Sequence, residues 1–224
     1  MLTTVRVWDL PTRVAHWSLV VCVIGLVVTS QVGGAAMAWH FRFGYGVLSL
    51  LLFRVVWGMV GGHWSRFSAF LYSPSTMLRY LRGQREAAHS VGHSPLGAAS
   101  VFAMLLLLSA QVATGLISDD EIDTSGPLTR WVSAALVSSA TFYHRKVGKI
   151  VLILLILTHL GAIAYYHFKK HEKLVSAMIH GDKAVDQPTF CSRDDGRSRL
   201  GALAIFLVCA ALVWLMLQLT ATQP

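Results

Sequence analysis

The sequence predicts an all-α integral membrane protein, and its composition and its long apolar stretches both support that fold class. Of the 224 residues, 54% are hydrophobic and only 13% are charged, whereas about a quarter of the residues in a typical soluble domain are charged. Five stretches are close to the length of about 20 apolar residues that a helix needs to cross the hydrocarbon core. Because backbone groups in lipid must be hydrogen-bonded within the protein, we expect each stretch to be a helix.

The five expected helices differ mainly in the few polar residues they contain. They cover residues 14–32, 43–60, 95–117, 150–168 and 200–219. The first contains His16, the second contains Arg54 as its one charge, and the fourth contains His159 and His167. The first stretch, with the small residues AMA at 36–38, also resembles a secretory signal peptide, but it is longer than the usual apolar core of about 7–15 residues. We therefore expect it to be a membrane helix.

Lysine and arginine are concentrated in three parts of the chain outside these helices. The N-terminus, residues 61–94 and residues 169–199 are basic, whereas the loop at 118–142 opens with four acidic residues. Because basic loops remain on the cytoplasmic side, we predict a multi-pass membrane protein with a cytoplasmic N-terminus and a C-terminus on the opposite, periplasmic side. The net charge of +8 is spread over several loops, which favours contact with a membrane surface and argues against nucleic-acid binding.

Four histidines lie within the expected helices or at their ends, where an ionisable side chain is costly and indicates function. His16 is near the inner end of the first helix, and His40 is at the outer start of the second. His144 and His159 belong to the fourth helix. A helix turns about 100° and rises about 1.5 Å per residue, so these two project from nearly one face about 22 Å apart.

Depth in the membrane restricts how the four histidines can pair. His40 and His144 are both near the outer surface, and His16 and His159 are both on the inner side. Two imidazoles at each of two depths are the axial ligands that two stacked haems need. The alternative is that the histidines only hydrogen-bond neighbouring helices. The matched depths favour cofactor binding, and the absence of a Cys-x-x-Cys-His motif argues against a c-type haem.

Other residues bear on the expected haem sites. Arg54 lies 14 residues after His40, on a related face about 21 Å deeper, where it could pair with a propionate of the inner haem or extend to the nearby membrane surface. Gly44 and Gly148 each follow a ligand histidine by four residues, which would leave room for a flat macrocycle or simply allow close helix packing. His93 is a candidate for a quinone or proton-transfer role, although a solvated residue is the simpler interpretation.

Five segments carry a resemblance to a known family: VWDLPTRVAHW (7–17), FRVVWGMVGGHWSRFSAFLYSP (53–74), GHSPLG (92–97), SDDEIDTSGPL (118–128) and HEKLVSAMIHGDK (171–183). In order and spacing they resemble bacterial cytochromes b561, especially the b-type cytochrome subunits of nickel–iron hydrogenases. The resemblance implies a four-helix bundle with two haem b groups, whose axial ligands match His16, His40, His144 and His159. In that family the two fourth-helix histidines are more usually 14 residues apart, so this chain departs from the pattern at His144.

The resemblance covers about residues 5–183, and it also implies the function and a place in the bacterial inner membrane, but it says nothing about the role of the last helix. We expect a dihaem cytochrome b transmembrane domain (1–183), a cytoplasmic linker (184–199) and a C-terminal transmembrane helix (200–224). The protein would transfer electrons in a respiratory chain between a quinone pool and a partner redox protein. That partner would be a hydrogenase, a dehydrogenase or a c-type cytochrome. We therefore expect the chain to be an electron-transfer subunit of a complex and not a stand-alone enzyme.

Two other functions remain open from the sequence. One is a superoxide:quinone oxidoreductase that acts without a partner. Its anionic substrate would be attracted by the basic residues near the outer surface, although the acidic loop opposes this. These residues are Arg42, Arg145, Lys146 and Lys149. The other is a haem-free anchor or transporter subunit in which the histidines serve only for packing.

Overall fold

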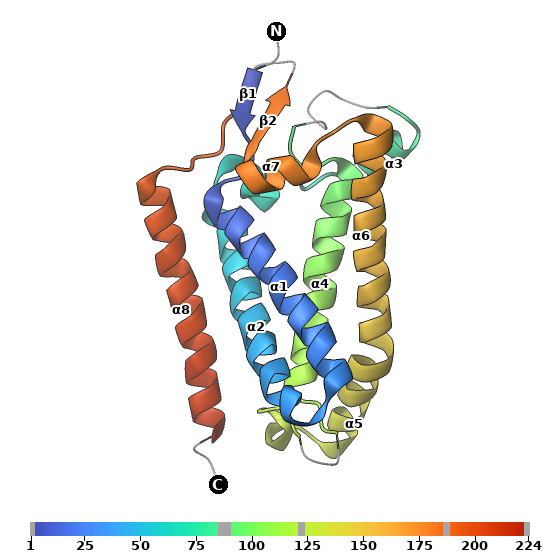
Figure 1. Cartoon of the computed structure of the whole chain (residues 1–224), viewed down its shortest axis with the longest axis vertical. Coiled ribbons are helices and arrows are strands. Elements are labelled where there is room, and N and C mark those ends of the chain that lie inside the picture. Colours follow the sequence, from blue (N-terminus) through green and yellow to red (C-terminus); the bar gives the residue numbers. More distant parts are fainter. Residues whose placement is uncertain (1–2, 85–90, 121–123, 186–188, 222–224) are drawn as a thin grey trace. The chain divides into compact units, whose positions relative to one another are not determined.

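The computed structural model describes residues 3–84, 91–120, 124–185 and 189–221, and it is almost entirely helical (Figure 1). Within these residues, five helical segments are long and apolar enough to cross a membrane. The long helices are α1 (Leu10–Val32), α2 (Met37–Val60), α4 (Pro95–Leu116), α6 (Lys149–Lys170) and α8 (Gly196–Ala221). The prediction of an all-α membrane protein with five spanning helices is confirmed.

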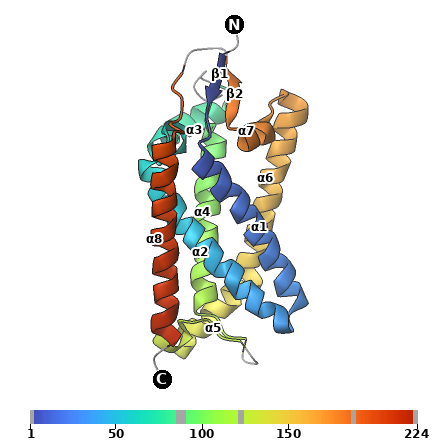
Figure 2. The ribbon, with the colours of Figure 1, turned by 60° about the vertical axis from the view of Figure 1, so that its left-hand side comes forward.

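The helix boundaries differ from the prediction most clearly before α6. The sequence predicted a loop up to residue 142, but α5 (Ala134–Phe142) is helical and runs through a π-helical segment (Tyr143–Gly148) into α6, as Figure 2 shows. Ser133 begins α5 as an N-cap, because its hydroxyl accepts a hydrogen bond from the Leu136 amide. The loop prediction was therefore wrong for residues 134–142, which are mostly apolar and contain neither glycine nor proline.

Short elements occupy the connections. They are α3 (Pro74–Leu81), α7 (Leu174–His180), and the 3₁₀ turns Gly34–Ala36, His63–Ser65, Phe67–Ala69 and Thr129–Trp131. Strands β1 (Thr3–Arg6) and β2 (Asp182–Val185) pair antiparallel, with Arg6 opposite Asp182. Both Figure 1 and Figure 2 show this ribbon next to α7. The ribbon was not predicted, because four-residue strands almost 180 residues apart carry no local pairing signal.

The chain divides into two compact units. The first unit contains Met1–His16, Arg54–Ala103 and Leu157–Ile205, and the second contains Trp17–Phe53, Met104–Ile156 and Phe206–Pro224. The first unit has a core in which Val7, Trp8 and Ala177 are buried, and the second is centred on Val47 and Leu108. Each unit therefore contains one of the two predicted histidine pairs, His16 with His159 and His40 with His144.

Some polar residues of the loops lie outside the described residues. They are His89 and two of the four acidic residues that open the 118–142 loop, Glu121 and Asp123.

Candidate functional site

The structure brings His40 and His144 together in the second unit. His40 lies in the first turn of α2, and His144 lies in the π segment that precedes α6. Both side chains are half-buried. The centres of the two imidazole rings are 6.3 Å apart, and the ring planes are at 85° to each other. The two rings thus lie close together and nearly perpendicular to each other.

One nitrogen of each ring is already fixed by a backbone carbonyl. Nδ1 of His40 is 3.1 Å from the carbonyl oxygen of Leu26, and Nδ1 of His144 is 2.8 Å from that of Gln111. A carbonyl can only accept, so both Nδ1 atoms must carry the proton. In a neutral imidazole this leaves the lone pair on Nε2. Metal-binding histidines are held in this way, with the other ring nitrogen bonded to a carbonyl or a carboxylate.

The distance between the rings fits two ligands of a single ion. A metal–imidazole bond is about 2 Å long, so two imidazoles on opposite sides of one ion have ring centres roughly 6 Å apart. Within the described parts of the chain, no group of three or more histidine, cysteine or acidic residues could hold a metal ion. Two donors are too few for a protein-only site of the zinc type, but they are sufficient for haem, whose macrocycle supplies the other four nitrogens.

The π segment gives a physical reason for the unusual spacing of His144. A π turn closes with i→i+5 hydrogen bonds and so accommodates more residues per turn than an α-helix, and such turns are frequent at functional sites. Gln111 of α4 supports this segment, since its side-chain Nε2 donates to the carbonyl oxygen of His144 at 2.9 Å. The segment can therefore take up the one extra residue in the spacing from His144 to His159 within its own widened turn.

Two of the three glycines near these residues allow neighbouring side chains to approach the helix backbone closely. A side chain at Gly115 would begin 2.8 Å from the His144 ring, and one at Gly148 would overlap the side chain of Gln111. Gly148 therefore allows helix packing and leaves no room for a macrocycle. A Cβ at Gly44 would meet only Leu26, at 4.0 Å.

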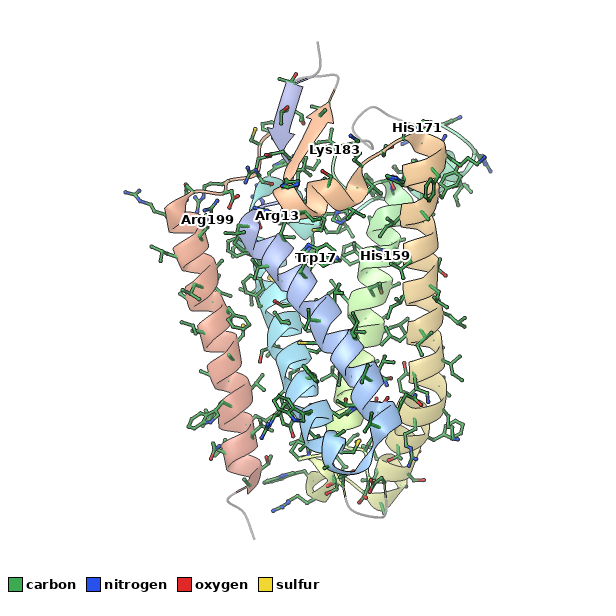
Figure 3. The ribbon with its side chains drawn as sticks, viewed as in Figure 1. Arg13, Trp17, His159, His171, Lys183 and Arg199 are labelled. Carbon is green, nitrogen blue, oxygen red and sulfur yellow. The ribbon has the colours of Figure 1, made fainter. Side chains whose placement is uncertain are left out.

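His16 and His159 both belong to the first unit. His16 is in the second turn of α1, and His159 lies midway along α6 (Figure 3). Both are half-buried. The structure thus places this predicted pair in the same unit, as it does the His40 and His144 pair.

Arg54 is buried in the first unit, with only 8% of its surface exposed. Its guanidinium lies 4.7 Å above the centre of the Phe67 ring. Its Nη1 atom is buried and has no hydrogen-bond partner within the described residues. This side chain is therefore enclosed within the first unit and carries a nitrogen with no hydrogen-bond partner among the described residues.

Asp9 is a central polar residue that the sequence interpretation missed. It is completely buried and caps α1, because the Thr12 amide donates to its Oδ1 at 2.8 Å. Trp57 Nε1, the Gly62 amide and the Ser65 hydroxyl also donate to its carboxylate. An aspartate two residues before a proline at the start of an apolar helix is a signal for such a cap, but the distant partners leave no trace in the sequence.

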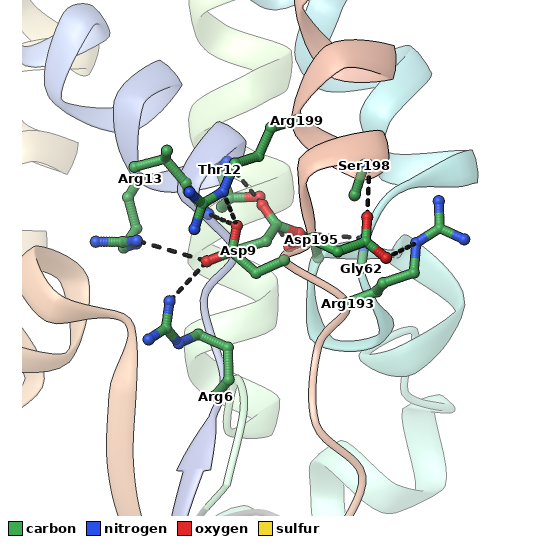
Figure 4. Close-up of polar contacts among 12 residues, drawn as sticks. Arg6, Asp9, Thr12, Arg13, Gly62, Arg193, Asp195, Ser198 and Arg199 are labelled. Carbon is green, nitrogen blue, oxygen red and sulfur yellow. Dashed lines mark hydrogen bonds and ion pairs between the residues drawn. The ribbon is translucent and has the colours of Figure 1, made fainter.

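Asp194 forms the main ionic cluster of the first unit, because Arg6, Arg13 and Arg199 all pair with its carboxylate. Figure 4 labels the three arginines. The Asp194 carboxylate also accepts a hydrogen bond from the Leu10 amide at 3.1 Å. Burial raises the pKa of Asp194, but the hydrogen bonds from Arg199, Leu10 and Arg6 outweigh it and lower the pKa below its usual value. The cluster ties the connection before α8 to the start of α1.

Comparison with known proteins gives one family. A family model described as prokaryotic cytochrome b561 matches residues 7–181. The chain is 26% identical over 216 residues to a probable Ni/Fe-hydrogenase B-type cytochrome subunit of Bradyrhizobium diazoefficiens, covering 80% of this chain and 86% of that protein. A protein of the same description from Rhodobacter capsulatus is 27% identical over 221 residues, covering 81% and 82%.

The chain is also similar, over a shorter stretch, to a probable Ni/Fe-hydrogenase 1 B-type cytochrome subunit of Escherichia coli K12. The identity is 27% over 135 residues, which cover 49% of this chain and 57% of that protein. No solved structure gives a significant match. The family model covers most of the chain, including all four histidines of the two pairs. The chain therefore belongs to the prokaryotic cytochrome b561 family and is a membrane-bound b-type cytochrome.

Proposed function

We propose that the protein is a dihaem cytochrome b, in which His40 and His144 bind one haem b and His16 and His159 bind a second. The observation that supports this most directly is the His40 and His144 pair, whose Nδ1 atoms are fixed by the carbonyls of Leu26 and Gln111. That arrangement leaves both Nε2 lone pairs free for iron. Each bound haem would supply a carrier for one electron.

The ligand set favours electron transfer over oxygen chemistry. Each histidine pair would hold a haem through two imidazoles, and a haem held in this way would supply electron transfer. The Gln111 carbonyl and the close approach of Gly115 hold the His144 ring, which limits its movement when the charge of the site changes. Arg54 places a positive charge in the first unit, where it can balance a haem propionate.

We further propose that the protein transfers electrons across the bacterial inner membrane between quinone and a partner redox protein. The similarity to proteins named as Ni/Fe-hydrogenase cytochrome subunits supports a hydrogenase as partner. A dehydrogenase or a c-type cytochrome could exchange electrons with the same two haems. The basic loops support a cytoplasmic N-terminus and a periplasmic C-terminus.

Haem counting tests the proposal directly. The purified protein should give a reduced-minus-oxidised spectrum of haem b, and pyridine haemochrome quantitation should find two haems per chain. One haem per chain would refute the dihaem assignment, and none would refute the function.

Single substitutions in α6 then test the assignment of ligands. His159→Ala should remove one haem and leave the other, because the remaining pair lies in the second unit. His167→Ala is the matched control, since His167 is an exposed residue of the same helix. Retention of both haems in His159→Ala would contradict the proposed pairing.

Partner and quinone need a separate assay in membranes. Inverted vesicles that contain the protein and its hydrogenase should reduce a quinone with hydrogen, and His144→Ala vesicles should not. Equal quinone reduction by both preparations would show that electrons do not pass through this haem.

A further inference from the structure

Besides Nε of Arg13, two buried nitrogen atoms of the first unit lack hydrogen-bond partners among the residues that the structure describes. They are Nη1 of Arg54 in α2 and Nδ1 of His93, two residues before α4. Buried polar atoms in folded proteins are nearly always hydrogen-bonded, so an unpaired one requires an explanation. Two in one neighbourhood suggest a group that binds to both.

The two side chains flank the same aromatic cluster. The His93 ring lies 4.3 Å from the ring centre of Phe70 and 4.7 Å from that of Trp8. Phe70 is 5.9 Å from Phe67, which in turn lies under the guanidinium of Arg54. The Tyr72 hydroxyl donates to the backbone carbonyl of His93 at 2.8 Å. His93 is thus held in place by its neighbours while its Nδ1 remains unpaired.

The charges around this aromatic cluster favour the binding of an anion. Burial, and secondly the positive charge of Arg54, lower the pKa of His93 to about 3, so its imidazole is neutral and can donate one hydrogen bond from Nδ1. Arg54 stays charged, and a buried charge without a hydrogen-bonded partner is strongly unfavourable. Asp9 attracts Arg54 electrostatically, but the oxygens of Asp9 already accept hydrogen bonds from Trp57, Gly62 and Ser65.

We infer that Arg54 and His93 together form a binding site for a carboxylate. A carboxylate accepts from several donors at once and would satisfy both nitrogen atoms. This inference rests on the proposed function, under which the carboxylate is a propionate of the haem held by His16 and His159. A phospholipid phosphate is the other anion that a membrane offers, and the experiment separates the two.

The experiment uses the full-length protein with its haems, purified in detergent. Arg54→Leu and His93→Leu each remove one donor. Arg54→Lys and His93→Gln keep a donor and serve as conservative variants. Arg82→Leu removes an exposed arginine from the same unit and is the charge control. His159→Ala identifies which haem signal belongs to the first unit.

Redox titration is the first measurement. In Arg54→Leu the propionate charge is no longer balanced, so the reduced form of that haem is destabilised. We expect about a tenfold lower ratio of reduced to oxidised haem at a fixed ambient potential, which corresponds to about 59 mV for a one-electron couple. His93→Leu should shift the ratio less, the conservative variants should restore most of it, and Arg82→Leu should not change it. Unchanged potentials in both leucine variants, with both haems bound, would overturn the inference.

Infrared spectroscopy identifies the anion. With haem labelled by carbon-13 at its propionate carboxyls, the reduced-minus-oxidised spectrum should show a propionate band that moves in Arg54→Leu and His93→Leu only. If the band stays and the variants instead lose one tightly bound phospholipid phosphate, the propionate assignment is wrong. If the wild-type protein binds no haem, the proposed function fails before this comparison can be made.

Discussion

The two units hold their histidine pairs in different ways. In the second unit, the rings of His40 and His144 are fixed by backbone carbonyls and by a glycine, and no charged side chain is hydrogen-bonded to either ring among the contacts that the structure describes. The first unit, which contains His16 and His159, is rich in buried charge instead. Asp9, Arg54 and Asp194 are all largely or completely buried there.

This difference separates two tasks of a cofactor site. A carbonyl bond to Nδ1 selects the tautomer and orients the ring, so the geometry of the second unit defines ligands. Buried charges adjust the electrostatic potential at a site and bind ionic groups on the cofactor. We therefore expect substitutions that loosen the histidine rings of the second unit to affect haem retention, and substitutions of the buried charges of the first unit to affect stability and potential.

The largest expected effect is the loss of one haem in the second unit. His144→Ala removes one of two axial ligands, so haem content should fall from two haems to one per chain by pyridine haemochrome assay. The other haem should keep its spectrum and potential. His180→Ala, at an exposed histidine of α7, should retain both haems. Two haems in His144→Ala would mean that His144 is not a ligand and would remove the basis of the comparison.

The next effect is a loss of stability in the first unit. Asp9→Ala leaves the donors of Trp57, Gly62 and Ser65 buried without their acceptor, and each such loss costs about 1–3 kcal/mol. We expect a fall of at least about 3 kcal/mol in unfolding free energy, followed by circular dichroism in detergent. Asp195→Ala is the matched control, because Asp195 also caps a helix through the Ser198 amide but is exposed.

In Asp195→Ala, loss of the helix cap should lower the unfolding free energy by only about 1 kcal/mol. Equal losses in the two variants would show that Asp9 acts only as a helix cap. The buried network would then contribute little to the first unit.

A feature could be predicted from the sequence when its signal lies within one short stretch of the chain, and it was missed when it depends on contacts between distant residues. The spanning helices were predictable because hydrophobicity is a property of each stretch by itself. The histidines stood out because an ionisable residue in an apolar stretch is costly. The partners of Asp9 and the pairing of β1 with β2 depend on contacts between distant residues, which composition and periodicity do not encode. The π segment around His144 is a small local change in hydrogen bonding that has no residue signature.

A smaller effect in the second unit concerns the support of His144. Gln111→Leu removes the Nε2 donor to the His144 carbonyl but keeps the backbone carbonyl that accepts from Nδ1. Loss of such an indirect contact typically weakens metal binding about 10- to 100-fold. We expect faster transfer of one haem from the protein to apomyoglobin, with the other haem unaffected. Ser109→Ala on the same helix is the control, since Ser109 is exposed.

Equal haem transfer from Gln111→Leu and from the wild-type protein would show that the π segment needs no support from α4. The backbone carbonyl of Gln111 would then be sufficient to hold His144.

The smallest effect concerns the pH dependence of the first unit. The pKa of Asp194 is lowered in the folded protein, so its ionised form stabilises the fold above the unfolded pKa of about 3.9. That contribution is lost as the pH falls through the folded pKa. Asp194→Asn should therefore be less stable than the wild type at neutral pH, by roughly 1–2 kcal/mol, and the difference should shrink in acid. A difference that stays constant down to the lowest pH would assign the effect to packing and leave the charge of Asp194 without a role in this unit.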